Sequence, residues 1–362
     1  MNIPLLPRRA FLKTVAGAAA TAALGAPFRS EAAAGKIKLG MDNFSVRALG
    51  WKASQLLDYA DSLKLDTLFI SDLEAFDSLE EGYLRDVKAK ADALKIELYT
   101  GSWSICPSST RFRKDWGTAE EHLTTGIRVS KTLGSPVFRV VLGSAEDRKT
   151  PGGIRARIAD TVKVLKACEG KAKDANVKIS IENHAGDMHS WELVDLVEEA
   201  GKDFVGVNID SGNAAWTLED PLDLLERLGP YTNCSSLRDD MIWETSEGAS
   251  IAWTAAGEGL LDWKQWVARW SLLCPSVPIQ IETISGFSRG FSYKKAEFWK
   301  DYDKRPEVLA KFEALAKKGH AIPGFKAPEG VDKKVAEQDY QKAELARSIK
   351  YLREVIGLGL KS

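Results

Sequence analysis

The fold is decided by a stretch that reads V-K-I-S-I-E-N-H at 177–184 and V-G-V-N-I-D-S-G-N at 205–213. Both runs are short, apolar and rich in β-branched residues, which is typical of buried parallel strands. Between them, residues 191–201 have helical spacing and end in glycine. The stretch therefore predicts a strand–helix–strand unit with Glu182 and Asp210 at the carboxyl ends of its strands, where parallel α/β folds place their chemistry.

Each of these acids on its own also suits a structural role, as a strand-end cap or a salt-bridge partner. His184 and Asn213 stand beside them in the sequence, and a cluster of this kind favours a functional site over two separate caps.

Outward from this unit, strand-like and helical runs alternate along the chain. The strand-like runs are 37–44, 66–70, 96–100, 137–142, 177–182, 205–210, 234–237 and 278–283. Eight strands that alternate with helices predict an α/β fold of the (β/α)8 TIM barrel type. A doubly wound open sheet is the alternative, but no G-x-G-x-x-G string follows the first strand.

The chain divides into three predicted parts: a signal at 1–34, the barrel at 35–295 and a C-terminal helical extension packed on the barrel at 296–362. The extension contains helical patterns at 306–319 and 335–356, joined by a link rich in Pro, Gly and Lys. These helices are suited to covering the base of the barrel, extending its rim or forming a homo-oligomer.

The first 34 residues predict export rather than part of the fold. Pro7-Arg8-Arg9-Ala10-Phe11-Leu12-Lys13 resembles a twin-arginine (Tat) signal, followed by an Ala/Gly-rich run and small residues at 32–34. The run is too short and too rich in alanine to span a membrane. The expected location is the periplasm of a bacterium, with the Tat translocase as partner during export; a frayed helix with two chance arginines is the alternative.

Charge and cysteine content exclude several classes of protein. Removal of residues 1–34 takes away four basic residues and one acidic residue, leaving 46 basic against 50 acidic and a formal charge of −4. With no basic block, nucleic acid is not expected as a partner. The four cysteines form no C-x-x-C pair, which argues against a zinc knuckle or a redox motif.

Four predicted strand ends carry polar side chains that a closed barrel would bring together: Glu182, Asp210, Ser236 and Glu282. Carboxylates that converge repel one another unless a cation or shared protons neutralise them. We therefore expect these four residues to bind one divalent metal ion through oxygen ligands. An acid cluster without metal is the alternative.

At this point the chain resembles the xylose isomerase-like TIM barrels, the sugar phosphate isomerase/epimerase superfamily. The matching strings are I-E-N-H at 181–184, N-I-D-S-G-N at 208–213, S-L-R-D at 236–239, G-E-G at 257–259 and I-E-T at 281–283. The resemblance implies that Glu182, Asp210 and Glu282 bind Mn²⁺, Mg²⁺, Co²⁺ or Zn²⁺, and that the two glutamates move a proton between neighbouring carbons of a keto sugar. The histidine ligand of the family falls where this chain has Ser236, a weaker ligand.

The chemistry that suits such a site is removal of a proton α to a carbonyl, which gives a cis-enediolate. Glu182 and Glu282 are the candidate catalytic base and acid. Candidate substrate-binding residues are His184, Asn213, Trp103, Arg139, Arg148 and Arg238, because aromatic faces stack on sugars and arginines bind hydroxyls or anions. Each also has a structural alternative, as a core residue or a salt bridge.

The predicted function is a metal-dependent isomerase or epimerase of a non-phosphorylated sugar or keto sugar. One alternative is a lyase that acts on a 3-keto glycoside through the same proton abstraction. The other is a barrel that binds carbohydrate without converting it. A trinuclear zinc endonuclease site is disfavoured, because only His184 and His189 lie near the strand ends.

Overall fold

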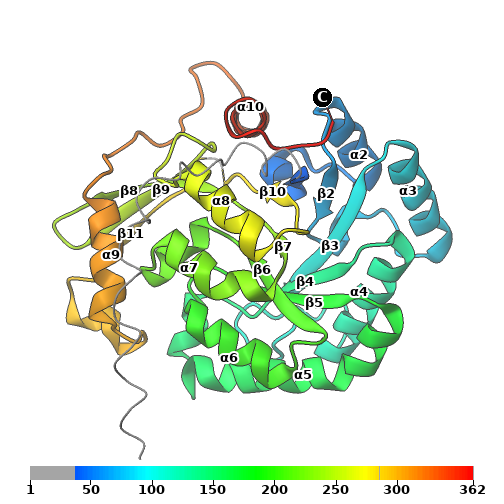
Figure 1. Cartoon of the computed structure of the whole chain (residues 1–362), viewed down its shortest axis with the longest axis horizontal. Coiled ribbons are helices and arrows are strands. Elements are labelled where there is room, and N and C mark those ends of the chain that lie inside the picture. Colours follow the sequence, from blue (N-terminus) through cyan, green and yellow to red (C-terminus); the bar gives the residue numbers. More distant parts are fainter. Residues whose placement is uncertain (1–36, 285, 362) are drawn as a thin grey trace, which may run out of the picture.

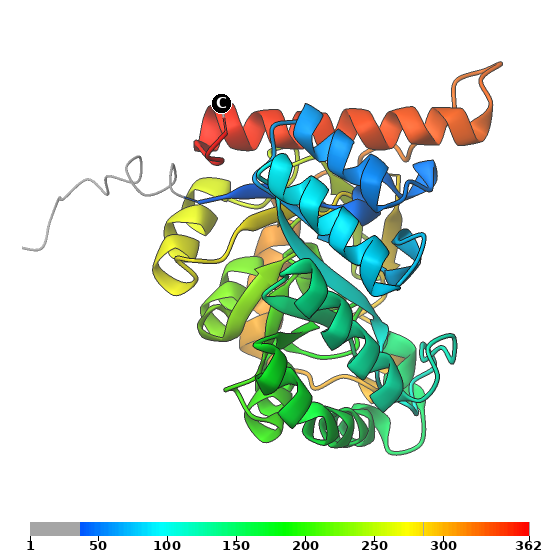
Figure 2. The ribbon, with the colours of Figure 1, turned by 90° about the vertical axis from the view of Figure 1, so that its right-hand side faces the viewer.

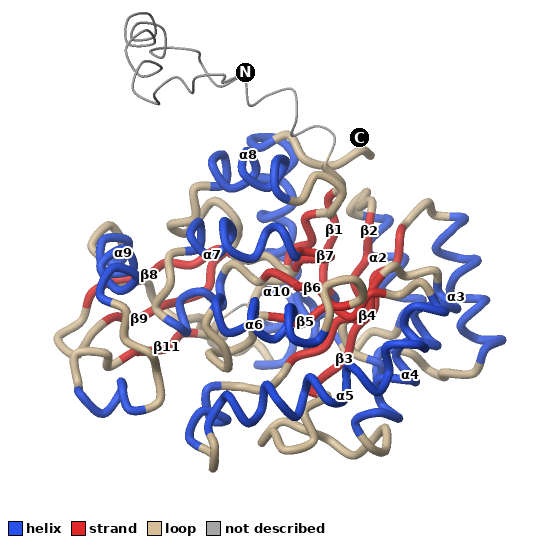
Figure 3. The backbone as a smooth tube through the Cα atoms, turned by 60° about the horizontal axis from the view of Figure 1, so that its bottom comes forward, coloured by secondary structure: helices blue, strands red, loops and turns tan. Residues whose placement is uncertain are grey.

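Eight parallel strands stand at the centre of the computed structural model, which describes residues 37–284 and 286–361. The predicted signal at 1–34 lies outside the described residues. In order around the sheet, the strands are β10 (Ile279–Ile281), β1 (Leu39–Asp42), β2 (Thr67–Ile70), β3 (Glu97–Ser104), β4 (Val137–Val141), β5 (Lys178–Glu182), β6 (Val205–Ile209) and β7 (Thr232–Ser235). Their backbones lie side by side in the middle of the molecule (Figure 3).

A short seam between β7 and β10 joins the two ends of this sheet. Leu237 pairs with Ile281 in a parallel bridge. The Leu237 N–H donates to the Gln280 carbonyl at 2.8 Å, and the Glu282 N–H donates to the Leu237 carbonyl at 2.9 Å. The Ser235 hydroxyl adds a bond to the Pro278 carbonyl at 2.9 Å. The sheet is therefore a nearly closed barrel, and the predicted (β/α)8 fold is confirmed.

Helices surround the barrel (Figures 1 and 2). They are α2 (Ala53–Ser62), α3 (Glu81–Ala93), α4 (Ala119–Leu133), α5 (Gly153–Ala175), α6 (Ser190–Ala200), α7 (Pro221–Leu228) and α8 (Trp263–Leu273). Local signals fix their ends. Thr118 and Glu121 form a capping box at the start of α4. Asp220 caps α7, and Pro221 occupies its first turn. Five 3₁₀ turns in the described residues come after strands: η1 (Asn43–Leu49), η2 (Leu73–Ala75), η3 (Ala145–Lys149), η4 (Gly212–Thr217) and η6 (Ala296–Lys300). A sixth, η5 (Gly229–Tyr231), joins α7 to β7.

A second, three-stranded antiparallel sheet was not predicted from the sequence. Its order is β11 (Ser288–Phe291), β9 (Ala249–Thr254) and β8 (Asp239–Glu244), and it stands beside the barrel next to α9 (Pro306–Ala316) (Figure 1). The β8–β9 hairpin lies between strand seven and its helix, where the barrel pattern predicts only a loop. Residues of this sheet and of α9, such as Trp253 and Phe312, form a separate apolar cluster.

The helix α10 (Lys333–Tyr351), followed by the π-turn η7 (Leu352–Ile356), runs along the flank of the barrel (Figure 2). Its Gln338 and Gln341 side chains bond to the backbone of Ala48, in η1 just after β1. Near the C-terminus, the backbone N–H groups of Leu360 and Lys361 donate to Asp66, just before β2. The segment from α10 to Lys361 therefore contacts the chain just after β1 and again just before β2. None of the helices in the described part of the chain has the length and apolarity needed to cross a membrane.

Candidate active site

Three carboxylates from different strands meet at the carboxyl end of the barrel. Glu182 is the last residue of β5, Asp210 follows β6 directly, and Glu282 follows β10 directly. One carboxylate oxygen from each lies within 4.8 Å of the others, and all three side chains are buried. Residues that are 100 positions apart in the sequence, Glu182 and Glu282, therefore share one site, because parallel strands of a barrel end at one face.

A fourth buried carboxylate, Asp42 at the end of β1, was not singled out from the sequence. It accepts hydrogen bonds from the Ser71 hydroxyl at 2.6 Å and the Phe44 N–H at 2.8 Å on Oδ1, and from the Ser236 hydroxyl at 3.1 Å on Oδ2. Burial and the nearby Glu282 carboxylate raise its pKa to about 7. Its position at a strand end, like those of Glu182 and Asp210, was the available signal.

Two buried arginines balance part of this negative charge. Arg139 of β4 forms ion pairs with Glu182 at 3.1 Å and with Asp42 at 3.8 Å. Arg238 lies just before β8, and its Nη2 bonds to both Asp210 and Glu282. When all four acids are ionised, they carry four negative charges against two guanidinium charges, which leaves a net charge of −2 on this cluster. That deficit equals the charge of one divalent cation.

Burial is the main cause of the electrostatic shifts in the cluster. It raises the pKa of Glu182, Asp210 and Glu282, while Arg238 lowers the pKa of each of them. A buried carboxyl whose pKa is raised holds a proton more tightly than an exposed carboxyl does. The cluster therefore has the electrostatics expected of groups that exchange protons with a substrate.

Asn213 and His184 complete the polar part of the site. The Asn213 amide donates to Asp210 Oδ2 at 2.7 Å and to Glu182 Oε1 at 3.3 Å, so it fixes two of the acids relative to each other. His184 Nδ1 donates to the Gly143 carbonyl at 2.6 Å. Burial lowers the pKa of His184 to about 4. Since a carbonyl only accepts hydrogen bonds, the neutral ring carries its proton on Nδ1 and leaves Nε2 as an acceptor.

A pocket of about 270 Å³ opens onto Glu182 and Glu282. Its charged side includes Arg47, Asp72, Arg139 and Arg238, together with His184 and Asn213. Its apolar side is mostly aromatic and consists of Phe44, Trp103, Trp216, Trp253, Ile284 and Phe287. Asp210 supports the pocket from behind through Arg238 and Asn213. A pocket lined by both charged and aromatic side chains suits a polar ligand that has flat apolar faces, as sugars have.

The sequence comparison identifies the family. Residues 46–269 match the model of the xylose isomerase-like TIM barrel, which is more than half of the chain. The chain belongs to the xylose isomerase-like TIM barrel family. No curated protein sequence is similar enough to match it.

Solved structures of similar fold include three that share little sequence with this chain. D-psicose 3-epimerase in the presence of D-fructose is 14% identical with a TM-score of 0.58, over 89% of this chain and 100% of the other. The IOLI protein with a bound zinc atom is 15% identical with a TM-score of 0.52, over 79% and 100%. A probable 3-DHS dehydratase, AsbF from Bacillus anthracis, is 12% identical with a TM-score of 0.53, over 78% and 100%. At this identity they support the fold alone.

Within this xylose isomerase-like barrel, Ser236 is held by two neighbours. Its hydroxyl donates to Asp42 and accepts from the Asn208 amide at 3.3 Å. The same amide lies 3.2 Å from Glu182 Oε2. The hydroxyl thus links Asp42 to the cluster, at the position where the family resemblance implied a histidine ligand.

The remaining predicted substrate-binding residues separate into two groups. Trp103 lines the pocket, with its ring against His184 at a centroid distance of 6.5 Å and its indole N–H bonded to Asp72. Arg148 does not line it. The Arg148 guanidinium is buried and bonds to Glu192 and to the Gly186 and Asp301 carbonyls, which ties the loop after β5 to the C-terminal segment. Glu258, on the G-E-G loop, pairs with Arg347 on the surface.

The acidic cluster fits a divalent cation by donor type, spacing and charge. Its three carboxylates offer oxygen ligands within 4.8 Å of one another, as hard divalent ions require. The Arg238 Nη2 group already bonds to two of these carboxylates. An ion on the same oxygens therefore competes with Arg238 for them.

Proposed function

We propose that this barrel is an isomerase or epimerase of a sugar or keto sugar, which moves a proton α to a carbonyl with the help of one divalent cation. The observation that carries this proposal is the meeting of Glu182 and Glu282 in one pocket, with Asp210 behind them. The solved structures of similar fold include an epimerase, which agrees with this proposal but assigns no role to any residue of this chain.

Glu182 and Glu282 are the proposed proton carriers. Both line the pocket, both are buried, and burial raises the pKa of each. One carboxylate removes the proton from the carbon next to the carbonyl, and the other returns a proton to the product. Arg139 holds Glu182 in place through the ion pair at 3.1 Å, and Asn213 fixes its other oxygen at 3.3 Å.

Glu182, Asp210 and Glu282 would hold the cation, with Asp42 and Ser236 arranged behind them. When bound, such a cation stabilises negative charge that develops on the substrate oxygen. The chain itself contributes two further positive groups to the pocket, Arg139 and Arg238. Arg139 is held by its ion pairs with Glu182 and Asp42 before the reaction, so it stabilises the developing charge without rearrangement.

Substrate binding is assigned to the two sides of the pocket. The Asn213 amide already donates to Glu182 and Asp210, so its side-chain carbonyl and the unprotonated Nε2 of His184 suit sugar hydroxyls, both as acceptors. Trp103 and the aromatic wall of Trp216, Trp253 and Phe287 suit the C–H faces of a sugar ring. The N-terminal Tat-like sequence supports action in the periplasm on a sugar without phosphate, and this location stays a prediction.

The test is a panel of aldoses, ketoses and 3-keto glycosides in deuterated water with added Mn²⁺, followed by NMR. An isomerase or epimerase places deuterium on the carbon beside the carbonyl and yields an isomer of the substrate. Release of the aglycone from a 3-keto glycoside would instead identify the lyase alternative, which shares the first step. Sugar binding with no deuterium uptake from any substrate would contradict the proposed reaction and support a carbohydrate-binding barrel.

A further inference from the structure

Arg238 occupies the oxygens that the proposed cation needs. Its Nη2 group bonds to Asp210 and to Glu282, two of the three carboxylates in the cluster. The side chain is buried, so the ion pairs are shielded from water and are difficult to break without a replacement partner. A divalent ion that binds to the same oxygens therefore has to displace a guanidinium that is already seated there.

A second carboxylate lies beside Arg238 and has unused bonding capacity. Asp240 is two residues further along the chain, in β8, and both side chains lie within 2.8 Å of the position that a Cβ on Gly212 would take. It is buried, and its Oδ1 has no hydrogen-bond partner in the described structure. The Nε of Arg238 is also buried without a hydrogen-bond partner. A donor and an acceptor that both lack partners are thus close neighbours.

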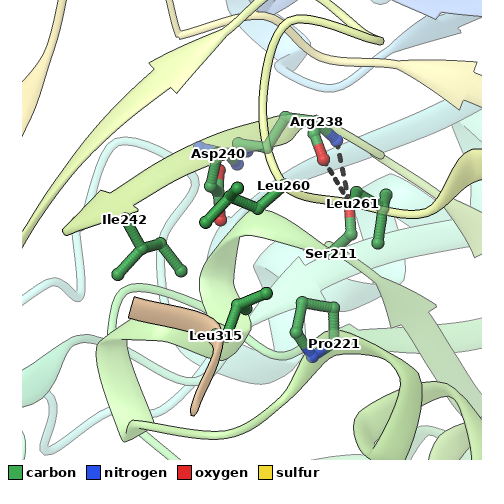
Figure 4. A pocket seen from close by; sticks show the side chains of 8 residues that line it. All are labelled: Ser211, Pro221, Arg238, Asp240, Ile242, Leu260, Leu261 and Leu315. Atoms are coloured by element: carbon green, nitrogen blue, oxygen red, sulfur yellow. Dashed lines mark hydrogen bonds between the residues drawn. The ribbon is translucent and has the colours of Figure 1, made fainter. Parts of the chain in front are cut away.

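Both residues line a small cavity between β8, the start of α7 and α9 (Figure 4). Its volume is about 10 Å³, on the order of the space that one water needs. The other lining residues are mainly apolar, such as Leu260 and Leu315. In these surroundings an unpaired acid is costly, and burial together with the adjacent Asp239 raises the pKa of Asp240 well above its usual range. The proposed reaction has no use for this acid.

Gly212 leaves room for both side chains. A Cβ at this position would lie 2.3 Å from Arg238 Cγ, 2.4 Å from its Cδ and 2.8 Å from Asp240 Oδ1. Any larger residue would push on the arginine stem and the aspartate together. The backbone N–H of Gly212 also donates to Asp210 at 2.9 Å. The turn that supports one carboxylate of the cluster therefore also provides the space around Arg238 and Asp240.

We propose that the Arg238 guanidinium has two alternative ion-pair partners. It pairs with Asp210 and Glu282 when no metal is bound, and with Asp240 when a divalent ion binds to the oxygens of those two residues. The proposal rests on the proposed function only in assuming that the cluster binds a cation. It requires no particular substrate or reaction. Movement of the guanidinium to Asp240 keeps the buried arginine paired with a carboxylate in both states, which lowers the cost of the exchange.

The test is isothermal titration of the purified, metal-stripped chain with Mn²⁺ at neutral pH. Arg238→Met removes the competitor, so Mn²⁺ should bind at least about tenfold more tightly than to the wild type. Asp240→Asn removes the second ion-pair partner of Arg238 and should weaken Mn²⁺ binding several-fold. In the Arg238→Met background, Asp240→Asn should not change Mn²⁺ affinity, because no arginine is left to pair with Asp240. Glu258→Gln, which changes a surface ion pair, is the control and should match the wild type.

Equal or weaker Mn²⁺ binding by Arg238→Met would overturn the proposal, as would an Asp240→Asn effect that persists in full without Arg238. If Arg238→Met does not fold, Asp240→Asn alone tests the proposal. Unchanged Mn²⁺ affinity in that variant would contradict Asp240 as a partner of Arg238. Failure of the proposed function is seen separately: a chain with these affinities that takes up no deuterium into any sugar would contradict the reaction and leave the role of Arg238 intact.

Discussion

Arg139 and Glu182 form a buried ion pair on neighbouring strands, with Nε and Oε2 3.1 Å apart. The N–H group of Nε is not aligned as a hydrogen-bond donor, so the contact is mainly electrostatic. Arg139 also donates to the Ser102 carbonyl at 3.0 Å and faces Asp42. It therefore holds the proposed base and the fourth carboxylate at the same time, from the strand next to that of Glu182.

Replacement of Arg139 by Met is expected to lower the free energy of unfolding by about 3–5 kcal/mol, because it leaves buried acids without their counter-charge. Arg155→Met is the matched control. Arg155 pairs with Asp195 at 2.9 Å on the surface, and exposed pairs contribute about 0–1 kcal/mol. Urea unfolding in the presence of chelator measures both. Similar losses for the two variants would contradict the importance assigned to the buried pair.

The stability of the protein should depend on pH through two buried histidines. Burial lowers the pKa of His184 and of His122 to about 4. Between pH 6.5 and 4 the unfolded chain binds more protons than the folded chain, so these two groups make stability fall as the pH is lowered through this range. The double variant His122→Gln/His184→Gln should lose less stability across it than the wild type. Parallel curves of unfolding free energy against pH would contradict this account.

At its exposed edge, the aromatic wall of the pocket should contribute more to sugar binding than to folding stability. Phe287 is 41% exposed and packs on Trp253 with ring centroids 4.7 Å apart. Phe287→Ala should change stability by less than about 1 kcal/mol, while sugar binding weakens about fivefold through the loss of a stacking surface. Leu272→Ala, at a 67% exposed position on α8, is the control. Calorimetric titration with the sugar that the enzyme converts should separate the two variants; equal affinities would show that the wall does not contact the ligand.

Cation binding should release protons, because burial raises the pKa of the carboxyl groups that would bind it. Mn²⁺ affinity is therefore expected to rise as the pH is raised, and the heat of binding to vary with the ionisation enthalpy of the buffer. A melting temperature that rises with Mn²⁺ concentration would accompany binding. Affinity that is independent of pH would mean that the acids are already ionised before the ion arrives.

Much of the fold could be predicted from the sequence because barrel strands are short apolar runs with polar ends. Glu182, Asp210 and Glu282 stand at three such ends, so the topology alone brings them together. The sheet formed by β8, β9 and β11 could not be predicted in this way, because it interrupts the alternation of strands and helices. Trp253 of this sheet and Phe287, just before β11, complete the pocket.

Side-chain partners from distant segments were beyond the reach of sequence patterns. Arg148 follows a barrel strand as a substrate-binding residue would, yet its partners are Glu192 and two backbone carbonyls far along the chain. Arg238 was predicted to contact substrate; it lines the pocket, and the structure adds its bonds to Asp210 and Glu282. Spacing along the sequence shows which strand end a residue occupies, but not which charge it meets there.

The most direct test of the central claim, that Glu182 and Glu282 move a substrate proton, follows deuterium uptake by NMR in single-site variants. In deuterated water with Mn²⁺, Glu182→Gln and Glu282→Gln should each reduce exchange at the carbon beside the carbonyl by at least about 100-fold, while the variants still fold and bind sugar. Glu258→Gln should exchange like the wild type. Full exchange in both Glu182→Gln and Glu282→Gln would contradict the account.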